Sequence, residues 1–245
     1  MKPRKIRLDA LLLERGLAVD AKEAQALVLA GQVLSGDTLL DSVATLLAVD
    51  AELRVRGRKA FASRAGDKLN AALDASGISV QGLTCLDLGA STGGFTHCLL
   101  QRGAAKVVAV DKGHQQLAWA LTQDPRVDSR ERCDALSLTP QDLPSPIRFV
   151  SADISFDSLK PFLPLVSRLL QAGGHWIFLV KPQFEADPAD VPKGGVVRDD
   201  LLRQQALDAI RDASQELGLG PQGSMASPIA GAKGNREWLL WGQKI

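Results

Sequence analysis

Four charged residues that lie far apart in the chain have the side chains needed for proton transfer. Lys68, Asp153, Lys181 and Glu237 each stand at the edge of a predicted strand or helix. A neutral lysine amine can accept a proton from a weakly acidic hydroxyl, and carboxylates nearby can orient that amine. Each residue alone also has a structural explanation, because a Lys before a Pro often ends a strand and an Asp often caps a helix. Their joint occurrence with a ligand-binding loop is what favours a catalytic site.

A glycine-rich loop, residues 86–95, lies between the first two of these residues and links a predicted strand to a predicted helix. Its glycines tolerate positive φ and let a ligand approach the backbone. Asp111 ends the next strand 22 residues after Gly89, a spacing suited to hydrogen bonds with ribose hydroxyls. The separation of Gly89, Gly93 and Gly94 is not the G-x-G-x-x-G that a pyrophosphate usually requires. The loop therefore favours S-adenosylmethionine over a nicotinamide dinucleotide.

The residues expected to bind this cofactor come from the loop and from the ends of the following strands. Asp134, which follows residues 130–133, is the candidate for the adenine edge. The full predicted set is Asp87, Gly89, Ala90, Ser91, Gly93, Gly94, Phe95, Asp111, Lys112, Asp134 and Asp153.

The same loop contains a G-x-S-x-G pattern at residues 89–93, which also describes the nucleophile elbow of α/β-hydrolases. Such an enzyme needs a histidine late in the chain, after its acidic residue. The chain has three histidines, His97, His114 and His175, and the last begins a strand that is predicted to be buried. Their order argues against a hydrolase.

The elements that would carry these residues alternate between strand and helix from about residue 71 onward. This alternation predicts a mostly parallel Rossmann-like sheet covered by helices on both faces, with an antiparallel strand possible at the end. Strands are expected at 84–88, 106–110, 147–152, 175–180, 222–227 and 237–241. Helices are expected at 94–102, 115–121, 159–170 and 199–217.

The first sixty residues predict a separate small module. A short helix from residue 8 is followed by a second one that Asp20 caps with Glu23 three residues later, then by a hairpin at 32–40 and a strand at 52–56. Residues 1–70 contain 12 Lys and Arg against 9 Asp and Glu, whereas residues 71–245 contain 17 against 19. This asymmetry favours contact of the small module with a polyanion.

Composition excludes several other classes of protein. With 45% hydrophobic residues in 245, the chain can bury a sizeable core, but it contains no run of eighteen apolar residues. The basic start is not followed by the apolar segment of a signal peptide. Its three cysteines, Cys85, Cys98 and Cys133, form no Cys-x-x-Cys pair, so neither a disulfide framework nor a metal site is indicated. We expect a cytoplasmic protein without a membrane partner.

Four phrases of the sequence resemble the TlyA (hemolysin A-like) family over nearly the whole chain. They are SRAGDKL at 63–69, CLDLGASTGGFT at 85–96, VKPQFE at 180–185 and KGGVVRD at 193–199. The resemblance implies an S4-type RNA-binding domain followed by an FtsJ-like class I methyltransferase domain that modifies the 2'-hydroxyl of cytidine in ribosomal RNA. The turn at 35–37 departs from the Val-Asn-Gly usual in S4 domains.

The resemblance also implies roles for individual residues. The Lys-Asp-Lys-Glu pattern of the family falls on Lys68, Asp153, Lys181 and Glu237, and Lys181, fixed by Pro182, is our choice of base. Lys68 would favour the neutral amine of Lys181, whereas the two carboxylates would favour its charged form and orient it.

The predicted domains are residues 1–59, S4-like; 60–70, a linker carrying Lys68; and 71–245, FtsJ-like. The expected partner is ribosomal RNA or a ribosomal subunit, and residues 193–198 are a candidate substrate-gripping loop. The predicted RNA-binding residues are Arg4, Lys5, Arg7, Lys22, Arg54, Arg56, Arg64, Lys193 and Arg198, with Arg58 and Lys59 as further phosphate contacts.

Two alternatives stay open at this point. One is a non-catalytic RNA-binding factor for ribosome assembly with a vestigial cofactor pocket, and the other is an oxidoreductase of the nicotinamide type. The presence of all four charged positions, together with Gly89 and Asp111, argues against the first.

Overall fold

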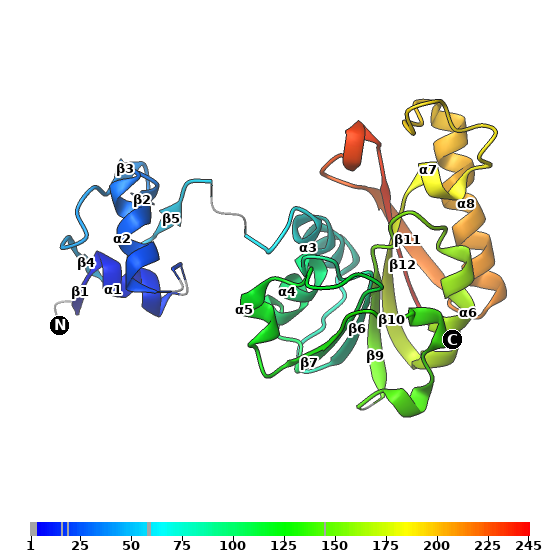
Figure 1. The fold of residues 1–245 in the computed structure, drawn as a ribbon, viewed down its shortest axis with the longest axis horizontal. Helices are drawn as coiled ribbons and strands as arrows, with labels where there is room; N and C mark the ends of the chain where they lie inside the picture. The colour runs from blue at the N-terminus through cyan, green and yellow to red at the C-terminus, as the bar shows by residue number, and fades with distance from the viewer. Residues whose placement is uncertain (1–3, 16, 19, 58–59, 145) are drawn as a thin grey trace. The chain divides into compact units, whose positions relative to one another are not determined.

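The computed structural model divides the chain into two compact units, Met1–Lys59 and Ala60–Ile245 (Figure 1). It describes residues 4–15, 17–18, 20–57, 60–144 and 146–245. Arg58 and Lys59, which we expected to contact phosphate, lie outside the described residues.

The described residues of the first unit form two short helices and five short strands around one small core. Asp20 accepts a hydrogen bond from the backbone N–H of Glu23 at 2.8 Å, the expected cap of the second helix. Leu8, Leu12, Val28 and Val33 are among the side chains of the core. The elements are β1 (Lys5–Arg7), α1 (Leu8–Glu14), α2 (Ala21–Leu29), β2 (Val33–Ser35), β3 (Thr38–Leu39), β4 (Leu46–Ala48) and β5 (Arg54–Val55).

The strands of this unit form two separate small sheets. β2 pairs with β3 as the expected hairpin and also with β5, which is two residues long where a strand at 52–56 was expected. The pairing of β1 with β4 was not predicted. Strands of three residues are too short to show the alternation on which a strand prediction depends.

The second unit is built on a seven-stranded sheet in the order β11-β12-β10-β9-β6-β7-β8. The five strands from β10 to β8 are parallel, and β12 is antiparallel to both β10 and β11. This mostly parallel Rossmann-like sheet with an antiparallel strand near its end confirms the predicted fold class. The strands are β6 (Thr84–Leu88), β7 (Lys106–Val110), β8 (Val127–Arg130), β9 (Ile147–Ala152), β10 (Leu170–Val180), β11 (Pro221–Ala226) and β12 (Trp238–Gln243).

Helices cover both faces of this sheet (Figure 1). One face packs under α3, α4 and α5 in a core that includes Leu69 and Leu99, and the other packs under α6 and α8 in a core that includes Val166 and Ile210. The helices are α3 (Ala65–Ser76), α4 (Gly94–Gln101), α5 (Trp119–Thr122), α6 (Leu163–Leu169), α7 (Pro182–Glu185) and α8 (Asp200–Glu216). Short 3-10 turns are η1 (Ala135–Ser137), η2 (Pro140–Asp142), η3 (Lys160–Phe162) and η4 (Ala232–Gly234).

Two expectations for this unit need correction. Residues 60–70 are not a linker throughout, because α3 begins at Ala65 and belongs to the second unit. The helix expected at 115–121 is reduced to the single turn of α5, since Gln115 has φ +52 and the carboxylate of Glu131 accepts hydrogen bonds from the backbone N–H groups of residues 115–117. In the described part of the chain, no helix is long and apolar enough to cross a membrane.

Candidate active site

The loop after β6 is held against two other segments by glycines that leave no room for a side chain. Gly89 has φ +77, and a Cβ on it would lie 2.6 Å from the carbonyl oxygen of Asp153. A Cβ on Gly94 would lie 2.2 Å from the Oγ of Ser63 and 3.0 Å from the backbone nitrogen of Gly66. These contacts bring the start of α3 and the end of β9 to the same loop.

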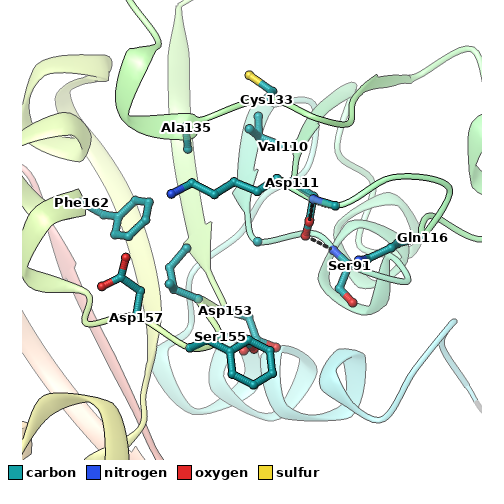
Figure 2. Close-up of a pocket in the computed structure, with 15 residues that line it drawn as sticks. Ser91, Val110, Asp111, Gln116, Cys133, Ala135, Asp153, Ser155, Asp157 and Phe162 are labelled. Atoms are coloured by element: carbon teal, nitrogen blue, oxygen red, sulfur yellow. Dashed lines mark hydrogen bonds between the residues drawn. The ribbon is translucent and has the colours of Figure 1, made fainter. Parts of the chain in front are cut away.

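Asp111, at the carboxyl end of β7, fixes this loop from the neighbouring strand. Its carboxylate accepts hydrogen bonds from the backbone N–H groups of Ser91 at 2.8 Å and Gly113 at 2.6 Å. The bond to Ser91 is drawn in Figure 2, where Asp111 borders a cavity. The cavity has a volume of about 480 Å³, within the range of small-molecule binding sites.

Predicted cofactor residues are divided between this cavity and a smaller one beside it. Gly89, Ser91, Asp111, Lys112 and Asp153 line the larger cavity. The smaller one, of about 100 Å³, is lined by Ala90, Phe95 and Ser63 among others, and again by Gly89, Ser91 and Asp153. Asp153 therefore faces both spaces.

Four predicted cofactor residues line neither cavity: Asp87, Gly93, Gly94 and Asp134. Asp87 is fully buried and accepts hydrogen bonds from the hydroxyls of Thr96 at 2.7 Å and Ser151 at 2.9 Å. Its burial raises the pKa of Asp87 to about 6, against the lowering effect of the two hydroxyls. Asp87 thus joins β6, β9 and α4 beneath the loop.

Asp134 also has a structural role. Its carboxylate accepts a hydrogen bond from the backbone N–H of Leu136 at 3.2 Å and so caps η1, and it lies 3.5 Å from the Nζ of Lys112. Its neighbours Cys133 and Ala135 line the cavity instead. The contact of Asp134 with the adenine edge stays a prediction.

Sequence reasoning missed the rest of the cavity wall, which comes from loops directly after β7, β8 and β9. Phe156 is 92% exposed and has φ +68, a backbone conformation unusual for an aromatic residue. The available signal was position, since ligands bind beyond the carboxyl ends of parallel strands. The missed residues are Val110, Gly113, Gln116, Cys133, Ala135, Ile154, Ser155, Phe156, Asp157 and Phe162.

Glu185 holds one of these loops in place from α7. It is buried and accepts hydrogen bonds from the Oγ of Ser158 at 2.5 Å and the backbone N–H of Leu159 at 2.8 Å. Burial raises the pKa of Glu185. Residues 155–157, which line the cavity, are thereby connected to the strand end that carries Lys181.

The four charged residues form two ion pairs at the carboxyl end of the sheet. The Nζ of Lys68, on α3, lies 2.5 Å from the Oε2 of Glu237, and the Nζ of Lys181 lies 2.6 Å from the Oδ1 of Asp153. The β10–β12 register pairs Val180 with Trp238, so its continuation by one residue sets Lys181 opposite Glu237. The structure therefore brings all four positions to one end of the sheet.

Lys181 makes two further polar contacts. Its Nζ donates to the carbonyl oxygen of Ile154 at 2.9 Å and to the Oγ of Ser155 at 3.0 Å. These two oxygens accept two of the three protons of an ammonium, and the carboxylate of Asp153 is its ion-pair partner without a hydrogen bond to the Oδ1. A neutral amine would keep two of these bonds and have a lone pair for a substrate hydroxyl.

The predicted RNA-binding residues lie in both units. All nine are exposed. The first unit contains Arg4, Lys5, Arg7, Lys22, Arg54 and Arg56, and the second contains Arg64, Lys193 and Arg198. Arg7 is partly engaged, because its guanidinium forms an ion pair with Asp9 at 2.7 Å. Their contact with RNA stays a prediction.

Comparison with known proteins finds relatives over most of the chain. The model of the FtsJ-like methyltransferase family matches residues 61–244. The 16S/23S rRNA (cytidine-2'-O)-methyltransferase TlyA of Mycobacterium tuberculosis is 43% identical over 246 residues, which is 97% of this chain and 90% of the relative. The solved structure of a hemolysin-like protein from Streptococcus thermophilus has a TM-score of 0.74 and 37% identity, and covers 98% of this chain and 88% of that one. An S-adenosylmethionine dependent methyltransferase from Mesorhizobium loti, 18% identical with a TM-score of 0.52, covers 71% of this chain and 96% of its own and shares the fold.

Proposed function

This chain belongs to the TlyA family of FtsJ-like methyltransferases, and we propose that it transfers a methyl group from S-adenosylmethionine to the 2'-hydroxyl of cytidine in ribosomal RNA. The observation that carries the proposal is the position of Asp153, which lines the cofactor cavity and forms an ion pair with the buried Lys181. The candidate base thus contacts two residues, Asp153 and Ser155, that line a cavity suited to the cofactor.

The residues of the cavity fit S-adenosylmethionine. The carboxylate of Asp111 would bind the ribose hydroxyls, and the backbone at Gly89, where a side chain has no room, would lie against the ligand. When bound, S-adenosylmethionine supplies an electrophilic methyl group on a sulfonium. The protein supplies the position of the acceptor hydroxyl and a group that takes its proton.

We assign that group to Lys181. A ribose hydroxyl is a very weak acid, so its attack needs both in-line placement and a proton acceptor. The amine of Lys181 takes the hydroxyl proton, and Asp153 together with the Oγ of Ser155 keeps the amine oriented. Lys68 and Glu237, paired with each other, hold the opposite side of the site through α3 and β12.

RNA binding is shared between the two units in this proposal. We assign the exposed cations of the first unit, including Arg54 and Arg56, to the RNA backbone, as in an S4-type domain. Lys193 and Arg198 contact the RNA backbone near the reacting nucleotide. Such a substrate, as ribosomal RNA or an assembled subunit, places the protein in the cytoplasm.

The test compares Lys181→Ala with Lys106→Ala, a matched change at the amino end of β7. We expect both variants to bind S-adenosylmethionine like the parent in calorimetric titration. Methyl transfer by Lys181→Ala should fall by about 100-fold or more, the usual contribution of a general base, and Lys106→Ala should stay near the parent. Activity of Lys181→Ala within a few-fold of the parent would refute the base assignment. Binding of a nicotinamide cofactor, with no response to S-adenosylmethionine, would instead revive the oxidoreductase.

A further inference from the structure

Asn235 is a buried polar residue that the proposed mechanism does not use. It is 2% exposed and lies two residues before Glu237 in the connection between β11 and β12. Its Nδ2 donates to the carbonyl oxygen of Gly195 at 2.7 Å, and its Oδ1 accepts from the backbone N–H of Val197 at 3.0 Å. Both ends of the amide therefore bind one segment, residues 193–198, which we call the basic loop. Loss of a buried amide that is satisfied in this way leaves backbone groups unpaired.

The basic loop is anchored by Val197, which is 1% exposed, and by a turn in which the backbone N–H of Gly195 donates to the carbonyl oxygen of Pro192 at 2.9 Å. Gly194 has φ +105 and Gly195 has φ +74, and no atom lies within 4 Å of the position of a Cβ on either residue. Besides Asn235, the side chain of Arg203 donates to the carbonyl oxygens of Val197 at 3.0 Å and Arg198 at 2.6 Å. Because glycines have no side chain to pack, residues 194–195 depend on these side-chain hydrogen bonds, together with the turn and Val197, for their conformation.

The backbone of Asn235 belongs to the same segment as Glu237, and hydrogen bonds hold this segment together. The backbone N–H of Gly231 donates to the carbonyl oxygen of Asn235 at 2.8 Å, and that of Ser227 donates to the carbonyl oxygen of Glu237 at 2.8 Å. The carboxylate of Glu237 is so close to Gly231 that a Cβ there would lie 1.9 Å from its Oε1. This connection, with η4 at its tip, projects beyond the end of the sheet at which β10 leads into α7 (Figure 1). Asn235 thus links the basic loop to the Lys68–Glu237 pair.

The two linked segments present four exposed cations. Lys193 and Arg198 are on the basic loop, and Lys233 and Arg236 are on the β11–β12 connection. Lys233 also donates to the carbonyl oxygen of Gly194 at 3.3 Å, so the two segments touch at a second point. Among the described residues, none of the four cations forms an ion pair with a carboxylate. Four cations without carboxylate partners can bind the phosphates of a nucleic acid.

The two acidic residues that directly follow the basic loop are engaged elsewhere. Asp199 accepts hydrogen bonds from the backbone N–H groups of Leu201 and Leu202 and so caps α8, and Asp200 pairs with Arg203. These interactions keep two carboxylates bound to α8 and leave the cations of the loop available.

We propose that Asn235 is a positioning residue that fixes the basic loop as a phosphate-binding platform beside Glu237. The platform would hold the RNA backbone of the substrate next to the reacting centre. This inference rests on the proposed function and extends the RNA contacts of residues 193–198 to residues 232–236, with Asn235 as the link between the two segments.

The test uses Asn235→Ala in the full chain, with Asn70→Ala as the matched control. The Oδ1 of Asn70 accepts hydrogen bonds from Arg102 at 2.6 and 2.8 Å, on α3 and away from the basic loop. We expect Asn235→Ala to raise KM for ribosomal RNA by about 10-fold, since a released loop loses one or two phosphate contacts. Its kcat should stay within about three-fold, and its affinity for S-adenosylmethionine should not change. A KM equal to that of Asn70→Ala, or a fall in kcat at unchanged KM, would overturn the proposal.

A double-mutant cycle separates positioning from a general loss of structure. Lys193→Ala should raise KM for RNA in the parent but have little further effect in Asn235→Ala, because the loop is already displaced. Fully additive effects would contradict the inference. If Asn235→Ala does not fold, Lys193→Ala and Lys233→Ala test the platform instead. Both substitutions should weaken RNA binding, and unchanged RNA binding in both variants would exclude the platform. If the parent transfers no methyl group, the proposed function fails, and filter binding of the same variants to ribosomal RNA still tests the platform.

Discussion

The buried ion pair between Lys68 and Glu237 should be very sensitive to the loss of one partner. Their side chains are 9% and 2% exposed, and the Nζ–Oε2 distance is 2.5 Å. Replacement of Lys68 by Met leaves a buried carboxylate without a counter-charge, and such one-sided changes cost about 3–5 kcal/mol. Glu237→Gln keeps an acceptor for Lys68 but leaves the cation uncompensated, so we expect a cost of about 2–3 kcal/mol. Both values refer to the free energy of unfolding of the second unit.

The double variant Lys68→Met/Glu237→Gln should recover a large part of that loss. With both charges removed, the desolvation of an unpaired ion no longer opposes folding, and we expect a coupling free energy of about 2 kcal/mol or more. Methyl transfer should not recover, because the cation and the carboxylate are both absent from the site. Stability and activity would then respond differently to the same pair of substitutions.

Urea unfolding followed by tryptophan fluorescence is the suitable assay. The four tryptophans, Trp119, Trp176, Trp238 and Trp241, all lie in the second unit, so the signal reports that unit. Single-variant costs below about 1 kcal/mol that simply add in the double variant would show that the two charges are not coupled in a buried site.

Two other changes test the buried support of the loop and the role of the first unit. Because burial raises the pKa of Asp87 to about 6, its contribution to stability is present below about pH 4 and is lost as the pH rises through 6. Asp87→Asn should remove a decline of roughly 3 kcal/mol between pH 4 and pH 7, measured by urea unfolding across that range, and an unchanged pH profile would contradict this. In the first unit, Arg54→Gln/Arg56→Gln should flatten the slope of log K against log salt for RNA binding by roughly two, with Arg126→Gln, whose guanidinium is paired with Asp124, as the control. An unchanged slope would remove these two arginines from the RNA interface.

The fold of the second unit could be predicted from its sequence because the strands are apolar and the helices between them are periodic. β6, β7 and β9 have the bounds that were expected, and Lys181 falls directly after β10. Parallel strands end at one edge of a sheet, so residues at their carboxyl ends converge even when they are far apart in the chain. For the same reason the sequence placed Asp111 and Asp153 at one edge of the sheet, where both line the larger cavity.

Other parts of the site depend on tertiary contacts that no local pattern contains. The helical spacing of Leu69, Ala72 and Leu73 indicates α3. The helix was not predicted because residues 60–70, which include Gly66, were assigned to a linker. In irregular loops no sequence periodicity indicates which side chain faces a cavity. Asp134 caps a turn, whereas its neighbour Cys133 lines the larger cavity. The helix expected at 115–121 is shortened because the backbone N–H groups of residues 115–117 donate to the carboxylate of Glu131, a residue in a different segment.

Nucleoside mass spectrometry can detect methyl transfer by this protein to a ribose hydroxyl of ribosomal RNA. Ribosomal subunits from cells that lack this protein are incubated with the purified chain and isotopically labelled S-adenosylmethionine, then digested and analysed. We predict that 2'-O-methylcytidine carries the label with the parent protein and not with Lys181→Ala. Label on a base, or no label in RNA although S-adenosylmethionine binds, would contradict the claim.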